Sequence, residues 1–190
     1  MNAVPEATVF PEAARPGASD APLDRKHQCR GRIPEGLGEE TEDRAVISVE
    51  RSFVVRLPLP ELVTWLEDFA RTEEWDPGTV SCVRLDDGPV REGARWRNTS
   101  RFRGRTTELE YRLVVREPAR LVFVGENSTV TAVDDLRFDP EGDGTRLTYQ
   151  ASLKFKGLAK LAAPLLRPEF ERLADEVSAC LPTAAAAGRT

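Results

Sequence analysis

Three side chains that can donate or accept hydrogen bonds, Asn98, Tyr111 and Tyr149, occur in stretches that alternate between polar and apolar residues. Successive side chains of a strand point to opposite faces, so we expect these three on the inward face of a sheet. An apolar surface with a few polar groups is typical of a small-molecule site, in which apolar area supplies affinity and polar groups fix orientation. The alternative is that each polar group meets a partner within the core. The candidate ligand-binding residues are Trp96, Asn98, Ser100, Leu109, Tyr111, Leu113, Tyr149 and Ala151.

Two adjacent carboxylates, Asp134 and Asp135, resemble a pair for acid–base chemistry. Neighbouring strand residues point to opposite faces, so the two carboxylates cannot enter one site together. Aspartate is mostly exposed in proteins, which favours solvated edge or loop positions for both residues.

A run of arginines, Arg95, Arg97, Arg101, Arg103 and Arg105, could contact phosphate or acidic headgroups. Glu108 and Glu110 follow closely and partly neutralise that charge. The pattern therefore favours a solvated face.

Few other side chains point to chemistry. The only histidine, His27, precedes the aromatic-rich part of the chain, so histidine-based catalysis and metal binding are not expected there. The three cysteines, Cys29, Cys82 and Cys180, are far apart, and they show neither metal-ligand nor redox spacing. Free thiols fit a reducing compartment, and we expect a cytoplasmic protein. We predict no metal and no cofactor, and no residue receives a catalytic assignment.

Composition divides the chain. Residues 1–44 hold five Pro, four Gly and no Trp or Tyr, and we predict a disordered tail because too little apolar surface is present to offset the entropy of ordering. This tail is either a functionless extension or a docking arm. The formal net charge of −5 shows no basic excess, so no nucleic acid partner is expected. We also predict no transmembrane segment and no secretory signal. The sequence does not indicate an oligomeric state.

The first elements of the domain are a strand, short helices and a second strand. Residues 46–55 alternate and are rich in β-branched residues, which predicts a strand. Pro60 can begin a helix whose apolar positions continue to Phe69, and a second helical turn covers residues 71–75. Trp75-Asp76-Pro77 is interpreted as a structural stop. Residues 79–85 form the next predicted strand.

The strands at residues 94–102 and 106–115 are predicted to form a hairpin around Gly104. A loop of even length places Trp96 opposite Tyr111 and Arg97 opposite Glu110, whereas an odd loop would mix polar and apolar faces. Because a one-residue slip reverses every side chain, we expect the even loop. The Arg97–Glu110 pair should then add a few tenths of a kcal/mol, roughly the value of one cross-strand pair.

Three more strands and one helix complete the domain. Residues 121–125 and 130–138 are strands whose inward phase stays ambiguous, because residues 121–124 are apolar on both faces. Residues 145–155 alternate clearly. Residues 158–181 have an apolar stripe at helical spacing, with Pro164 and Pro168 predicting a kink or two segments. Pro182 is expected to end the helix, leaving residues 182–190 frayed. The stripe comprises Leu158, Leu161, Ala162, Leu165, Phe170, Leu173, Val177 and Leu181.

This order of elements, together with three short motifs, resembles the SRPBCC superfamily, which includes START lipid-binding domains and the polyketide cyclase/dehydrase group. The motifs are Trp75-Asp76-Pro77, Gly93-Ala94-Arg95-Trp96 and Gly144-Thr145-Arg146-Leu147-Thr148-Tyr149. The resemblance covers residues 45–181. It implies an α+β helix-grip fold: a seven-stranded antiparallel sheet wrapped on a long C-terminal helix around an apolar cavity, with two short helices between the first two strands.

We therefore expect this domain to bind a hydrophobic small molecule, such as a lipid, polyketide or aromatic metabolite, between sheet and helix. The alternative is a polyketide cyclase or dehydratase that uses Tyr149 or Tyr111 in the same cavity. The iron-dependent oxygenase branch of the superfamily needs a His/Asp site and is excluded by the lack of histidine in the domain. A third hypothesis is an interaction module that contacts a partner protein through the arginine-rich sheet face.

Overall fold

The computed structural model describes residues 46–188, so the predicted tail lies outside the described residues. The first strand, β1 (Val46–Val55), leads into helix α2 (Leu59–Leu66), turn η1 (Phe69–Arg71) and helix α3 (Thr72–Trp75). The other elements follow in this order: β2 (Thr79–Arg84), β3 (Arg95–Phe102), β4 (Arg105–Glu117), β5 (Arg120–Glu126), β6 (Val130–Glu141), β7 (Gly144–Phe155), η2 (Gly157–Ala162) and α4 (Ala163–Ala187).

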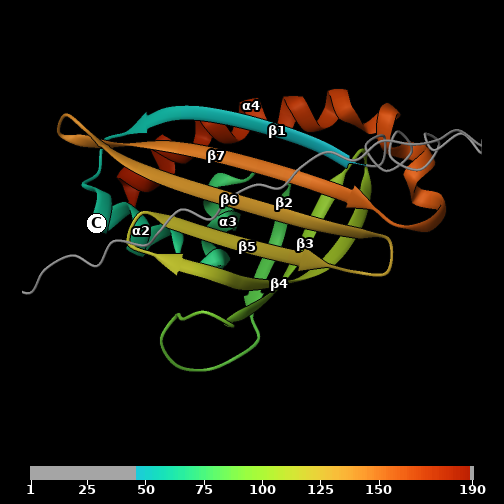
Figure 1. The fold of residues 1–190 in the computed structure, drawn as a ribbon, viewed down its shortest axis with the longest axis horizontal. Helices are drawn as coiled ribbons and strands as arrows, with labels where there is room; N and C mark the ends of the chain where they lie inside the picture. Colours follow the sequence, from blue (N-terminus) through green and yellow to red (C-terminus); the bar gives the residue numbers. More distant parts are fainter. Residues whose placement is uncertain (1–45, 189–190) are drawn as a thin grey trace, which may run out of the picture. The chain divides into compact units, whose positions relative to one another are not determined.

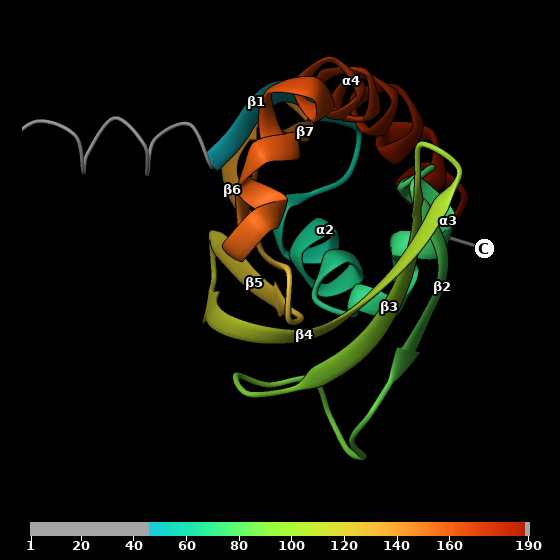
Figure 2. The same cartoon turned by 90° about the vertical axis from the view of Figure 1, so that its right-hand side faces the viewer.

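The seven strands form one antiparallel sheet in the order β1-β7-β6-β5-β4-β3-β2. Only β1 departs from a simple meander, because it pairs with the last strand. Figure 1 shows β1, β7, β6 and β5 side by side, with α4 behind β1 and β7. Figure 2 shows the sheet end-on, curling round with α4 along its open side and α2 and α3 toward the far end. This arrangement confirms the helix-grip prediction.

The β3–β4 hairpin has the predicted register. Trp96 lies opposite Tyr111, and Arg97 lies opposite Glu110. Arg103 and Gly104 form the two-residue loop, both with positive φ (49° and 76°), as a twist-matched hairpin turn requires. The ion pairs differ from the prediction, because long side chains reach diagonal neighbours as easily as direct ones. Arg95 Nη1 lies 3.1 Å from Glu110 Oε1, and Arg97 Nε lies 3.5 Å from Glu108 Oε1.

Two short helices cross one end of the curved sheet. Pro60 stands within the first turn of α2, where its missing N–H costs little. Asp68 caps η1 by accepting a 3.1 Å hydrogen bond from the Ala70 N–H. The same carboxylate accepts a 3.1 Å hydrogen bond from the Trp96 indole, which ties the helical segment to β3.

The C-terminal helical region consists of two segments, as the prolines predicted. The 3₁₀ segment η2 ends at Ala162, and α4 begins one residue before Pro164. The predicted end at Pro182 is wrong, since α4 continues to Ala187. Leu181 and Ala185 are fully buried on either side of Pro182, and this packing outweighs the one backbone hydrogen bond that the proline removes. No helix among residues 46–188 is long and apolar enough to cross a membrane.

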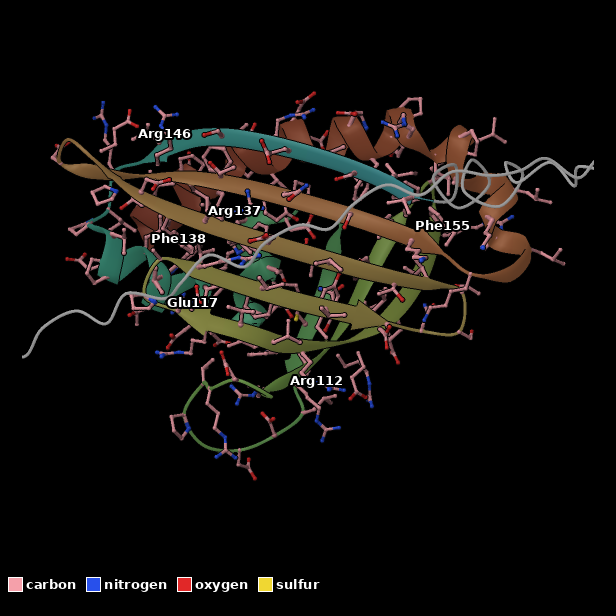
Figure 3. All side chains as sticks on the ribbon, viewed as in Figure 1. Arg112, Glu117, Arg137, Phe138, Arg146 and Phe155 are labelled. Atoms are coloured by element: carbon pink, nitrogen blue, oxygen red, sulfur yellow. The ribbon has the colours of Figure 1, made fainter. Side chains whose placement is uncertain are left out.

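The larger of two clusters of buried apolar residues fills one end of the curl. Phe123, Leu136 and Phe138 of β5 and β6 pack there on α2 and the C-terminal half of α4, each at most 2% exposed. Phe69 contacts this group, with its ring centroid 4.5 Å from that of Phe123. Figure 3 labels Phe138 at this end of the sheet and Phe155 at the other. The Phe155 end is the one that remains open.

Candidate functional site

A cavity of about 680 Å³ lies between the sheet and α4 at the Phe155 end. The inward residues of β4, β6 and β7 form its wall on the sheet side, and α4 supplies Phe170, Leu173 and Val177 opposite. These three belong to the apolar stripe that the helical spacing predicted. The volume is within the range of small-molecule pockets, and the walls are mainly apolar.

On each of three strands, the last residue that lines the cavity is polar. Along β6, Val130, Ala132 and Asp134 line the cavity, whereas the next inward residue, Leu136, belongs to the packed core. Tyr149 is the deepest lining residue of β7, and Tyr111 is the deepest of β4. We call Tyr111, Asp134 and Tyr149 the polar floor.

A glycine on β5 makes room for Tyr111 in the floor. Gly125 of β5 lies between Tyr111 on the neighbouring strand β4 and Ala132 on the neighbouring strand β6. A Cβ added at Gly125 would lie 2.6 Å from the Tyr111 ring, far below van der Waals contact. The tyrosine ring therefore crosses β5 through space that only glycine leaves open. Phe69 also packs against the Tyr111 ring, with ring centroids 4.4 Å apart.

The centre of the floor is a hydrogen bond between two strands. The Tyr149 hydroxyl donates to Asp134 Oδ1 at 2.6 Å, and Asp134 is only 8% exposed. Burial raises the pKa of Asp134 to about 6, although the Tyr149 hydrogen bond opposes this; the nearby Asp76 adds to the rise, and Tyr111 opposes it weakly. In turn, burial and the Asp134 charge raise the pKa of both tyrosines well above 10.

The interpretation of Asp134 and Asp135 as solvated residues is wrong, since each is 8% exposed. They do point to opposite faces, as predicted. Asp135 lies on the outer face, between Arg120 and Arg137 at 2.9 Å from each. Partial burial raises the pKa of Asp135, but hydrogen bonds from the two guanidinium groups outweigh that effect and leave the pKa below its ordinary value. Asp134 was missed although alternation along β6 places it in phase with Ala132 and Leu136.

A second carboxylate, Asp76, lines the cavity. It accepts hydrogen bonds from the Gly78 N–H at 2.9 Å and from the Thr79 hydroxyl at 2.7 Å. Burial raises the pKa of Asp76, and these two hydrogen bonds lower it in part. Asp76 thus stabilises the turn after α3, in agreement with the structural role expected for Trp75-Asp76-Pro77.

The predicted site residues divide between cavity and core. Ser100, Leu109, Tyr111, Tyr149 and Ala151 line the cavity. Trp96 and Leu113 are fully buried in the core beyond it.

Asn98 is 2% exposed, and its hydrogen bonds stay within the protein. Its amide nitrogen donates to the Thr79 hydroxyl at 3.0 Å, and its oxygen accepts from the Ser100 hydroxyl at 2.5 Å.

The cavity mouth is bordered by arginines and by the exposed Leu165. Arg101, Arg103 and Arg105 are exposed and border the opening, and Arg103 Nη1 donates to the Leu165 carbonyl at 3.2 Å. The first half of the predicted apolar stripe is not buried: Leu158, Leu161 and Leu165 are 88%, 80% and 72% exposed. Helical spacing indicates one face of a helix, but the sheet covers that face only from Phe170 onward.

The match to a family model decides the family. Residues 46–180 match the model described as "Polyketide cyclase / dehydrase and lipid transport". The chain belongs to this family. As a family member, it has the sheet, the two short helices and the long helix that the SRPBCC resemblance implied. No curated protein matches this family member by sequence.

Solved structures with the same fold include three at low sequence identity. A protein from Thermus thermophilus aligns with a TM-score of 0.63 at 15% identity, over 76% of this chain and 99% of its own. The Zhui aromatase/cyclase from a Streptomyces species aligns with a TM-score of 0.62 at 16% identity, over 74% of this chain and 94% of its own. A START superfamily protein from Mycobacterium smegmatis aligns with a TM-score of 0.61 at 13% identity, over 73% of this chain and 97% of its own. At such identities the likeness concerns the fold alone. Among the described residues, no group of three or more His, Cys, Asp or Glu could hold a metal.

Proposed function

We propose that this family member binds a hydrophobic small molecule in the cavity between sheet and α4. The cavity carries the proposal: about 680 Å³ of space with mainly apolar walls and a polar floor at its closed end. Apolar walls favour transfer of an apolar molecule from water, and the floor supplies the few polar groups that orient it. Family membership supports the same class of ligand, because the family description includes lipid transport.

Native mass spectrometry of freshly purified protein tests this proposal. The expected result is a mass above that of the protein alone, which returns to the protein mass after extraction with organic solvent. Ala132→Trp should abolish the extra mass, because Ala132 is a buried wall residue and an indole there would fill the space.

Gln150→Trp is the matched control. Gln150 lies on β7 between the cavity residues Tyr149 and Ala151, but its side chain points to the outer face, where it bonds to Arg137 at 3.1 Å. This variant should keep the ligand. Protein that carries no ligand and also fails to bind apolar fluorescent probes would overturn the proposal.

A second candidate function is a dehydratase or cyclase that uses Asp134, and the Tyr149–Asp134 hydrogen bond favours it. Burial keeps the pKa of Asp134 at about 6, near the value at which a carboxylate can accept and return a proton at neutral pH. In this reaction, the Asp134 carboxylate takes the proton α to a ketone. The electrons of the C–H bond then form the C=C bond, the C–O bond to the β-hydroxyl breaks, and Asp134 returns its proton so that the hydroxyl leaves as water.

The assay uses a β-hydroxyketone that carries an aryl ring and follows absorbance of the conjugated enone. Asp134→Asn should abolish turnover and Tyr149→Phe should lower it, whereas the outward Asp135→Asn should leave it unchanged. Turnover that survives Asp134→Asn would exclude this role.

A further inference from the structure

The polar floor presents acceptors rather than donors to the cavity. Tyr149 gives its only hydroxyl proton to Asp134 Oδ1 at 2.6 Å. The Tyr111 side chain also favours the ionised form of this carboxylate, as a hydrogen-bond donor would. A carboxylate has about four acceptor sites, and two tyrosines leave part of this capacity unused. The floor therefore has room for one more donor, and that donor has to come from the cavity.

The floor also carries negative charge without a cation beside it. The groups that influence Asp134 are Tyr149, Asp76 and Tyr111, and none of these described residues is a cation. The arginines nearest the cavity, Arg101, Arg103 and Arg105, lie exposed at the mouth, toward the hairpin turn. The two ends of the cavity thus differ in charge, with a basic mouth and an acidic floor.

A bound molecule changes the energetics of this floor according to its own charge. A buried carboxylate is costly unless it is paired and hydrogen-bonded, so a ligand that brings a cation relieves that cost. A ligand that brings a carboxylate adds a like charge beside Asp134 and Asp76, which disfavours its ionised form there. A neutral hydroxyl supplies a donor but no charge.

We propose that the cavity selects apolar ligands whose inner end is a protonated amine seated on Asp134, and that it discriminates against ligands that lead with a carboxylate. This inference rests on the proposed binding function and specifies the chemical class of the ligand. The apolar remainder of such a molecule lies along Ala132, Ala151 and Leu173 toward the mouth.

Three probes of equal chain length test the selection: n-decylamine, n-decanol and decanoic acid. Their dissociation constants are measured by isothermal titration calorimetry at pH 8, where the amine is protonated and Asp134, with its pKa of about 6, is ionised. A charge-assisted hydrogen bond in a buried site predicts that decylamine binds roughly tenfold or more tightly than decanol, with decanoate weakest.

Two variants assign the preference to Asp134. In Asp134→Asn, the decylamine-to-decanoate preference should fall by about tenfold or more, because the charge is gone while the shape is kept. In Asp135→Asn, which changes the outward neighbour on the same strand, the preference should stay as in the wild type. Decanol binding is expected in all three proteins, and it reports an intact cavity independently of charge.

The outcomes separate this inference from the function on which it rests. Decanol binding with no advantage for decylamine, or an advantage that survives Asp134→Asn, overturns the selection and leaves hydrophobic binding in place. Decanoate as the tightest ligand also overturns it, and points to headgroup binding at the arginines of the mouth. If none of the three probes binds, both proposals fail.

Discussion

The Tyr149 hydroxyl lies 2.6 Å from Asp134 Oδ1 and joins two adjacent strands at the floor of the cavity. The partners are not directly opposite in the sheet, since Asp134 pairs with Ala151 and Tyr149 pairs with Leu136. The hydrogen bond is thus a diagonal contact that holds a carboxylate in an apolar environment. Its most direct consequence concerns stability as a function of pH.

Asp134 should make the protein less stable as the pH rises. Its ordinary pKa of 3.8, which applies to the unfolded chain, rises to about 6 in the folded protein. Folding therefore favours the protonated form. The destabilisation is absent below pH 3.8, grows between pH 3.8 and about 6, and is complete above that. A shift of about two pKa units corresponds to roughly 3 kcal/mol.

Asp134→Asn should accordingly raise the free energy of unfolding at pH 8 by about 2 kcal/mol, after an allowance of about 1 kcal/mol for a weaker bond from Tyr149. Urea unfolding at pH 4 and pH 8 measures this, and the gain should largely vanish at pH 4. Asp135→Asn is the control. It should lower the free energy of unfolding at pH 8, because the arginines beside Asp135 lower the pKa of its carboxylate. Destabilisation by Asp134→Asn at pH 8 would contradict the prediction.

Gly125→Ala should destabilise the protein through Tyr111. The new Cβ would lie 2.6 Å from the Tyr111 ring, so the ring or strand β5 has to move. Overpacking of this kind costs about 1–3 kcal/mol. Chemical denaturation measures the loss.

A double-mutant cycle with Tyr111→Ala identifies the cause. With the ring removed, an alanine at position 125 has space. Gly125→Ala should therefore lower the free energy of unfolding much less in the Tyr111→Ala background than in the wild type. Equal costs in the two backgrounds would show that the glycine is needed for backbone reasons instead.

Two leucines at opposite ends of α4 should respond differently to truncation. Leu181 is fully buried, whereas Leu165 is 72% exposed. Leu181→Ala should lower the free energy of unfolding by about 2–5 kcal/mol, the usual cost of a core cavity. Leu165→Ala should change it by less than about 0.5 kcal/mol. Thermal unfolding of both variants checks this, and similar losses would contradict the exposure of Leu165.

The two cysteines described in the structure should differ in reactivity. Cys82 is buried and Cys180 is exposed. Burial raises the pKa of the Cys82 thiol, which lowers the fraction of reactive thiolate. In a Cys29→Ser background, iodoacetamide at pH 8 should modify Cys180 under native conditions and reach Cys82 only after denaturation. Peptide mass spectrometry locates the label, and rapid labelling of Cys82 in folded protein would refute the prediction.

Local sequence patterns determined the elements and much of their pairing. Alternation in β3, β4 and β7 depends only on the two-residue period of a strand, so it can be recognised without any partner. The same period, together with Gly104, sets the register in which Trp96 meets Tyr111. Proline positions likewise predicted the break between η2 and α4. Of the predicted site residues, Ser100, Leu109, Tyr111, Tyr149 and Ala151 do line one cavity.

Tertiary structure alone decided where the apolar surface is covered. β5 is apolar on both faces, so only its packing shows that Phe123 points inward. Asp134 looks like a surface residue by type, but strand phase and sheet curvature bury it. Leu158 looks like a core residue by spacing, yet it is 88% exposed. The physical reason is that periodicity defines a face locally, whereas burial depends on what distant segments bring against that face.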